Sequence, residues 1–471
     1  MNTSLASRSG FGRRAARGVP ETAAPLADET PLSPLYRLRP GELWRAMQRQ
    51  PASFWLLNAY LFFEYVRPQV IYDSIKGWPL ASWAIYSCLA ALFLEGHKLR
   101  RWSLADTGLV VYSIIILAST LTAWSPAASR AGYNLWFSWM VIYWMITTLV
   151  NSESRFLLFL LWYFLLNAKM SQHGVRGFIE AGGSFRSWGA TGGPGWFRNS
   201  GEFGIEMTIF VPMAVFFVLA LRRYWTRRTF WVVMFLPVSG LISIIATSSR
   251  GAQLAIAAVG LWFILKSPHR IRALVIASVS AGALFVLLPE GQKQRFTEMG
   301  TDKTSLSRLT YWADAREMMS QYPVLGIGYN NWIPYYRTYY NADGELPHNI
   351  FYQAGAELGF TGLVGFIGLI IITLIINYRT RKLASELPDG GRFALNMAHG
   401  LDGALIGFLV SGYFVTVLYY PFFWINLAFT VALHNSTRNE IARHALRTQP
   451  PPLTRLGTRP ALPGAVRSHA P

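Results

Sequence analysis

The sequence of 471 residues has one cysteine and few charged residues, and both scarcities exclude large classes of protein. Because Cys88 is alone, neither a disulfide framework nor a thiolate cluster for zinc or iron–sulfur can form within the chain. Charged residues make up 14% of the sequence, whereas soluble domains average about 25%. Hydrophobic residues reach 52%, which excludes a disordered chain and argues against a soluble one.

Long apolar runs indicate what kind of protein remains. Twelve segments approach the roughly 17–25 residues that a helix needs to cross a bilayer. They cover residues 52–71, 78–94, 105–124, 133–150, 155–172, 204–221, 230–248, 250–265, 272–289, 352–377, 401–419 and 421–436. Eighteen Trp, 22 Tyr and 30 Phe are typical of a protein that anchors at two membrane interfaces. The predicted fold is an all-α polytopic membrane protein with about 12 transmembrane helices.

The net charge of +19 follows from basic residues that gather in alternate loops. Examples are Lys98 to Arg101, Arg222 to Arg228 and Arg379 to Lys382. Because Lys and Arg concentrate on the cytoplasmic side of membrane proteins, we expect these loops and both termini to be cytoplasmic. The placement of the charge predicts contact with membrane lipids and no nucleic-acid partner.

The chain divides into tails, spans and two long loops between spans. We expect disordered basic cytoplasmic tails at residues 1–50 and 437–471, nine spans within 51–289, and three spans within 349–436. A glycine-rich loop at 173–203 and a large loop at 290–348 are predicted to be periplasmic. The apolar spacing from Ser305 to Gln321 predicts an amphipathic helix in the large loop, with Ser305 or Ser307 as its N-cap. Asp402 is placed at the cytoplasmic start of the eleventh span, where a carboxylate suits the helix dipole.

Arg250 lies at the outer tip of a tight hairpin between the seventh and eighth spans. An arginine at the edge of the hydrocarbon costs about 2.5–3.5 kcal/mol unless it reaches water or an anion. It is either an interfacial anchor or a guanidinium held for phosphate, whose oxygens its planar fork binds in pairs. Ser249 and the free amide groups of the following helix would add donors to the same anion.

His348 and Arg308 are the other candidates on this membrane face. His348 precedes the tenth span, and histidine exchanges protons near neutral pH, although a histidine at a helix start is often only an interfacial residue. Asn349 beside it is a further candidate for substrate contact. Arg308 alone would be the solvated face of an amphipathic helix, but the convergence of Arg250, Arg308 and His348 on one face predicts a site for an anionic lipid headgroup.

These motifs resemble the O-antigen ligase and polymerase superfamily of bacterial envelope glycan enzymes. Arg250 followed by three residues and Leu254 is similar to the ligases' arginine motif. His348-Asn349, nine residues, Gly359, two residues and Gly362 is similar to their histidine motif. The segment Phe63 to Pro68 looks more like relatives of the O-glycosylation ligase type, and so leaves the acceptor open.

The resemblance implies transfer of a glycan from undecaprenyl diphosphate to a sugar hydroxyl of lipid A–core, at the periplasmic face of the bacterial inner membrane. It implies that Arg250 and Arg308 bind the diphosphate and that His348 positions or deprotonates the acceptor. Arg186 and Arg198, in the glycine-rich loop, match no sharp motif and are weaker candidates for phosphate contact.

Other functions stay open at this point. An O-antigen polymerase or a protein O-oligosaccharyltransferase would use the same donor, and a flippase or transporter of polyprenyl-linked sugars would perform no chemistry. A transporter is expected to place charges at mid-membrane, whereas these gather at one face. The sequence shows no metal-ligand spacing, P-loop or serine nucleophile elbow, so we expect neither a cofactor nor a metal.

Overall fold

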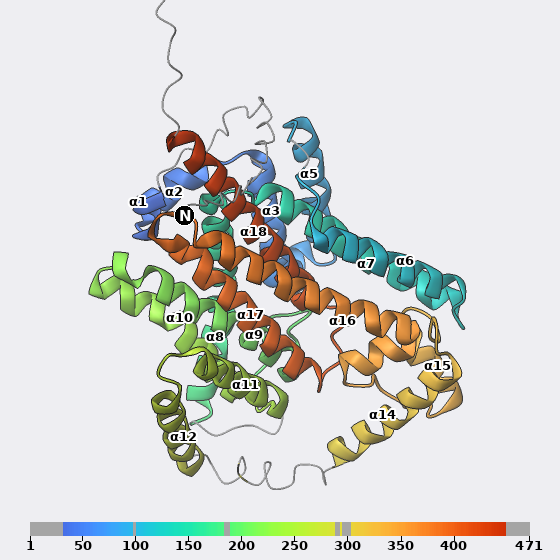
Figure 1. Ribbon diagram of the computed structural model, residues 1–471. Helices are drawn as coiled ribbons and strands as arrows, with labels where there is room; N and C mark the ends of the chain where they lie inside the picture. The colour runs from blue at the N-terminus through green and yellow to red at the C-terminus, as the bar shows by residue number, and fades with distance from the viewer. Residues whose placement is uncertain (1–31, 98–99, 183–188, 288–292, 294–302, 449–471) are drawn as a thin grey trace, which may run out of the picture.

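The computed structural model describes residues 32–97, 100–182, 189–287, 293 and 303–448. Within these ranges the chain forms helices and turns and contains no strand, which confirms the all-α prediction (Figure 1).

Each of the twelve predicted spans overlaps one of the longer helices, although several ends differ. These are α3 (Ala52–Tyr65), α5 (Leu80–Leu94), α6 (Leu104–Leu121), α7 (Pro126–Leu149), α8 (Glu153–Glu180), α9 (Ser200–Leu221), α10 (Arg227–Ala246), α11 (Arg250–Lys266), α12 (Arg270–Leu287), α16 (Ile350–Ala384), α17 (Arg392–Gly412) and α18 (Pro421–Thr448). Five helical stretches in the described part of the chain are long and apolar enough to cross a membrane: Leu104–Leu121, Ser200–Tyr224, Arg227–Ala246, Ile350–Ala384 and Pro388–Gly412. The total of twelve spans stays a prediction.

Shorter elements fill the two ends of the bundle. They are α1 (Leu32–Tyr36), α2 (Pro40–Gln48), α4 (Pro68–Ile71), η1 (Asp73–Ile75), η2 (Arg222–Tyr224), α14 (Lys303–Gln321), α15 (Trp332–Tyr339) and η3 (Pro388–Gly391). The helix predicted in the large loop is therefore present as α14. It already includes Lys303, so neither Ser305 nor Ser307 is its N-cap.

Helices α9 and α17 lie at the centre of the bundle (Figure 1) and pack against each other along much of their length. Gly400, Gly403 and Gly407 recur along one face of α17. A Cβ added to Gly407 would lie 2.5 Å from the carbonyl oxygen of Thr208 on α9, and one on Gly403 would lie 2.8 Å from Pro212 Cβ. Small residues at such contacts allow helix backbones to approach, which is how membrane helices gain packing energy.

Loops that the sequence places on the same membrane side meet in the structure. At one end the indole Nε1 of Trp225 donates to the Tyr36 carbonyl oxygen at 2.8 Å, and Arg223 pairs with Asp389 at 2.9 Å. We call this the inner end, because the sequence predicts it to be cytoplasmic.

The opposite end, which contains residues 323–348, is called the outer end. There the Trp124 amide donates to the Ile327 carbonyl oxygen at 2.9 Å, and the Ala190 amide donates to that of Ala246 at 2.8 Å. The contacts support the predicted alternation of sides along the chain.

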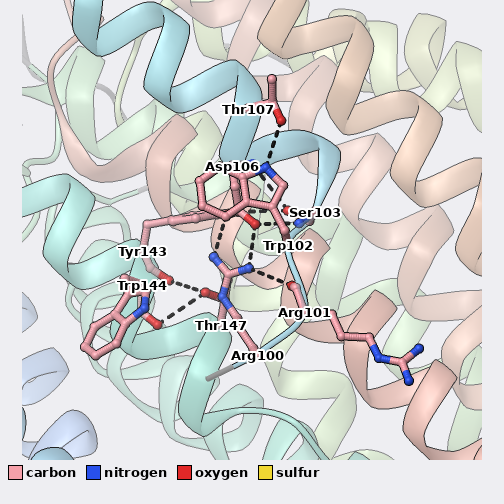
Figure 2. Close-up of polar contacts among 9 residues, drawn as sticks. All are labelled: Arg100, Arg101, Trp102, Ser103, Asp106, Thr107, Tyr143, Trp144 and Thr147. Atoms are coloured by element: carbon pink, nitrogen blue, oxygen red, sulfur yellow. Dashed lines mark hydrogen bonds and ion pairs between the residues drawn. The ribbon is translucent and has the colours of Figure 1, made fainter. Parts of the chain in front are cut away.

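The inner end of α6 is fixed by a polar cluster around Arg100 (Figure 2). Both terminal nitrogens of Arg100 bond the carboxylate of Asp106, with 2.7 Å from Nη1 to Oδ2. The Tyr143 hydroxyl donates to Asp106 Oδ1 at 2.9 Å, and the Ser103 amide donates to the same carboxylate. Part of the basic loop before α6 is thus locked to the helix start and to α7.

The prediction of disordered tails at 1–50 and 437–471 is wrong for the described part of each. Residues 32–50 contain α1 and α2, because Leu43 and Met47 of α2 pack against the main core and Gln50 accepts from Arg155 Nε at 2.8 Å. Helix α18 continues to Thr448, and the Asn439 side chain donates to the Asn151 carbonyl oxygen at 2.8 Å. Residues 1–31 and 449–471 lie outside the described residues.

The placement of Asp402 at a helix start is also wrong. Helix α17 begins at Arg392, so Asp402 lies near its middle and is buried. It accepts from Asn377 at 2.8 Å and from Arg381 at 2.5 Å, both on α16. The carboxylate therefore joins two helices.

The orientation can be tested by cysteine labelling. In a Cys88→Ser background, which keeps the donor to the Ser53 carbonyl, a cysteine at exposed Asp343 should react with an impermeant maleimide in intact spheroplasts. A cysteine at exposed Arg228 should react only after permeabilisation, because its loop is predicted to be cytoplasmic. The reverse pattern would invert the topology.

Candidate functional site

A non-helical segment between α17 and α18, residues 413–420, lies among the predicted site residues; we call it the outer loop. A Cβ added to Gly251 would lie 3.1 Å from Phe414 Cβ, so the outer loop touches the residue next to Arg250. The Thr416 hydroxyl accepts from the His348 amide at 2.7 Å. Segments about 100 residues apart in sequence, at Arg250 and His348, thus contact the same short loop.

His348 is held at the start of α16 in a strained backbone conformation. Its φ is 50°, in the left-handed region, which costs roughly 1–2 kcal/mol for a residue with a Cβ. The bond to Thr416 and the bond from Trp312 Nε1 to the Pro347 carbonyl oxygen at 2.9 Å fix this conformation. Strain of this kind is common at functional sites, where the surroundings enforce one orientation of a side chain.

The electrostatic surroundings of His348 favour the neutral imidazole. Burial lowers its pKa below the ordinary 6.5, and the positive charge of Arg308 lowers the pKa further. Glu345 acts in the opposite direction, and its Oε2 lies 3.5 Å from His348 Nε2. At neutral pH the side chain is therefore uncharged and able to accept a proton.

Arg308 lies near enough to His348 to lower its pKa, because α14 is packed against α16. Trp312, one helical turn after Arg308, stacks on Tyr352 with ring centroids 5.7 Å apart and meets Tyr413 of the outer loop at 5.2 Å. A second small core supports this contact, with Ala315 and Met318 of α14 packed against α15 and α16. The structure thus brings Arg308 and His348 together, as their common membrane face predicts.

A break in α16 at Gly359 positions the whole large loop. The φ of Gly359 is 68°, and an added Cβ would lie 2.4 Å from the Val324 carbonyl oxygen, so only glycine fits. Around the break, the amides of Ile327 and Gly328 donate to the carbonyl oxygens of Ala356 and Glu357 at 2.9 and 3.0 Å. In return, the Phe360 amide donates to the Pro323 carbonyl oxygen at 2.8 Å. The glycine of the histidine motif is therefore required by backbone pairing.

Arg250 is the first residue of α11, as expected, and sits at the positive end of that helix dipole. Ser249 is the N-cap, and its hydroxyl oxygen accepts from the Ala252 amide. That oxygen therefore has a structural role, while its hydrogen remains a donor for an anion. Gly204 of α9 lies close by, since a Cβ there would be 2.7 Å from Ala252 Cβ.

The three remaining predicted residues are Asn349, Arg198 and Arg186. Asn349 is buried, and its Oδ1 accepts from the amides of Phe351 and Tyr352 at 2.8 and 3.1 Å, so it is the N-cap of α16. Arg198 is exposed at the outer end, just before the start of α9. Arg186 lies outside the described residues.

Two residues of the site escaped the sequence analysis. Glu345 lies three positions before His348, a spacing that could have indicated a pair. Thr416 lies within the apolar run at 401–419, which hides the end of α17 at Gly412. In the described ranges, no group of three or more His, Cys, Asp or Glu could hold a metal ion.

The similarity to known proteins lies in the segment that contains these residues. The family model for O-antigen ligase matches residues 236–367, which include Arg250, Arg308, His348 and Gly359. An O-antigen ligase of Pseudomonas aeruginosa is 29% identical over 169 residues, covering 34% of this chain. The match covers 38% of the length of that ligase. The resemblance to the O-antigen ligase family is thus confirmed, and it covers the segment that brings Arg308 and His348 together.

Proposed function

We propose that the protein is a glycosyltransferase that moves a glycan from undecaprenyl diphosphate to a sugar hydroxyl of lipid A–core at the periplasmic face of the inner membrane. The observation that supports this most is the position of Arg308 next to a neutral, strained His348 inside the family-matching segment. The pair offers a cation for a phosphate leaving group and a base for a hydroxyl.

In this proposal the acceptor oxygen attacks the anomeric carbon of the glycan. The bond from that carbon to the diphosphate oxygen breaks, and undecaprenyl diphosphate leaves with the electron pair. Arg250 and Arg308 balance the charge that develops on the diphosphate. Weaker candidates for further contacts are Arg198, Arg186, Ser249 and the side-chain nitrogen of Asn349, which has no hydrogen-bond partner among the described residues. The acceptor proton passes to His348, whose Nδ1 has the lone pair when its Nε2 hydrogen is directed to Glu345.

Deletion of the gene separates the proposed acceptor from its alternatives. Loss of the whole lipopolysaccharide ladder on a gel, with lipid-linked polymer retained, is the outcome expected for a ligase. A single-repeat band would indicate a polymerase, and an unchanged ladder would indicate a protein acceptor or transport.

Arg250→Lys tests whether the two-pronged geometry of the guanidinium is needed. Lysine keeps the charge but loses the fork, so we expect kcat/KM for the donor to fall at least tenfold, and Arg250→Ala to fall further. Arg222→Lys, an exposed change at the inner end, is the control and should behave like wild type. Near-normal activity of Arg250→Lys would make Arg250 an interfacial anchor.

The pH profile tests the role of His348. A base must be neutral, so kcat/KM should be flat above pH 6.5 and fall only below the lowered pKa of His348. Glu345→Gln removes the charge that raises this pKa and should move the acid limb to lower pH, whereas Arg308→Gln should move it to higher pH. His348→Ala should lose about 10²–10⁴ in rate while still binding the donor. An acid limb that ignores both charge changes would rule out His348 as the base.

We also expect transfer to need no divalent metal, because two arginines can balance the leaving charge. Purified protein assayed with donor, acceptor and excess chelator should keep its activity. Loss of activity that magnesium or manganese restores would contradict this.

A further inference from the structure

A hollow of about 310 Å³ lies at the outer end, between α8, the end of α3 and residues 192–194. Residues 192–194 belong to the predicted glycine-rich loop at 173–203, whose first eight residues are part of α8. One wall is a face of α8 with Lys169, Gln172, His173 and Arg176, which the 3.6-residue helical period places together. Gly192 and Gly193 also line the hollow, and Leu166 and Val66 add apolar surface. The size is in the range of small-molecule sites.

The positive charge of Lys169 on this wall has no counter-ion among the described residues. Arg176 Nε pairs with Glu180 Oε1 at 2.7 Å. Lys169 and His173 make no hydrogen bond or ion pair with the described residues. Basic residues are disfavoured on the outer side of membrane proteins, so topology does not explain them there. An anion would complement this wall.

The occupant would enter from the bilayer. Along α8, exposed Leu165 precedes exposed Lys169, His173 and Arg176, so the lipid-facing stripe turns from apolar to basic toward the outer end. This change suits an amphiphile with an anionic headgroup and apolar chains. Gln172 and the backbone of Gly192 and Gly193 supply partners for hydroxyl groups.

One segment of chain separates this hollow from Arg250. A Cβ on Gly189 would lie 1.9 Å from the Thr247 carbonyl oxygen, so the backbone there touches the hairpin that ends at Arg250. Trp196 packs on Tyr420 of the outer loop, with ring centroids 4.7 Å apart. Arg67 lies 5.4 Å from the Trp196 ring centroid and pairs with Glu64 at 2.8 Å. These contacts hold Trp196 in the segment between the hollow and Arg250.

We propose that Lys169, His173 and Arg176 bind a phosphate group on the sugar headgroup of the acceptor glycolipid, which docks from the outer leaflet on the side of residues 189–196 opposite Arg250. The proposal rests on the proposed function for the identity of the acceptor. The donor diphosphate and the acceptor phosphate would then occupy separate basic clusters.

Binding is tested with the full chain in phosphatidylcholine nanodiscs. Lipid A–core should bind at least tenfold more tightly than its chemically dephosphorylated form, the effect of about one charge-assisted contact. The double variant Lys169→Gln/His173→Gln should lose this preference. Lys76→Gln, an exposed lysine at the outer end that does not line the hollow, is the matched control and should keep it. These side chains are exposed, and an unchanged melting temperature would show that the fold is intact.

Other outcomes would overturn the proposal. Phosphatidylglycerol or inorganic phosphate that competes as well as lipid A–core would make the hollow a general anion site. Equal binding by wild type and the double variant would exclude these residues.

Kinetics separate this proposal from the proposed function. The double variant should raise KM for lipid A–core about tenfold and leave kcat and the donor KM unchanged. A change in donor KM instead would assign the hollow to the donor. If wild type transfers nothing to lipid A–core but still binds it through its phosphates, the proposed function fails and the binding site stands.

Discussion

The break in α16 is the constraint on which the candidate site depends. A helix within a membrane normally satisfies its own backbone groups, and a break is tolerated only where other protein groups take over the hydrogen bonds. At Gly359 the chain from Pro323 to Gly328 does so, donating to two carbonyl groups of α16 and accepting from the Phe360 amide. Slipping this segment by one residue would leave several buried groups without partners. The position of the large loop, and with it α14 and Arg308, is therefore fixed by backbone geometry.

Packing in the centre of the bundle extends this order to Arg250. The glycine face of α17 against α9 brings their backbones close together, and α17 ends at Gly412. The outer loop then leaves the helix at Tyr413 and contacts both Gly251 and His348. The segments that contain Arg250 and His348 are thus both held by the outer loop, although they lie on different helices.

The sequence predicts the helices of this protein well and their ends less well. Apolar runs identify twelve of the helices in the described part of the chain, because burial in lipid or in the bundle demands such runs whatever the neighbours are. The start of α17 was placed nine residues late, since Arg392, Asn396 and His399 interrupt the apolar run in its first two turns. Helix α2 was missed because its packing against the core is a tertiary effect.

The candidate site divides in a similar way. Arg308 and His348 could be grouped from topology alone, because both precede the same span on one membrane face. The capping roles of Ser249 and Asn349 depend on local geometry, and serine and asparagine are favoured at helix starts irrespective of function. Thr416 could not be found, since its contact with His348 crosses 68 residues of sequence.

The charges around His348 also connect donor binding to the strength of the base. In the free protein burial and the charge of Arg308 lower the pKa of His348, and Glu345 raises it. If the diphosphate pairs with Arg308, as proposed, its negative charge offsets that of the guanidinium at the imidazole. One of the two effects that lower the pKa of His348 is then removed, so the pKa rises and the histidine becomes a better proton acceptor once the donor is in place. Arg308 would therefore stabilise the diphosphate leaving group, and it would keep His348 a weaker base until the donor binds.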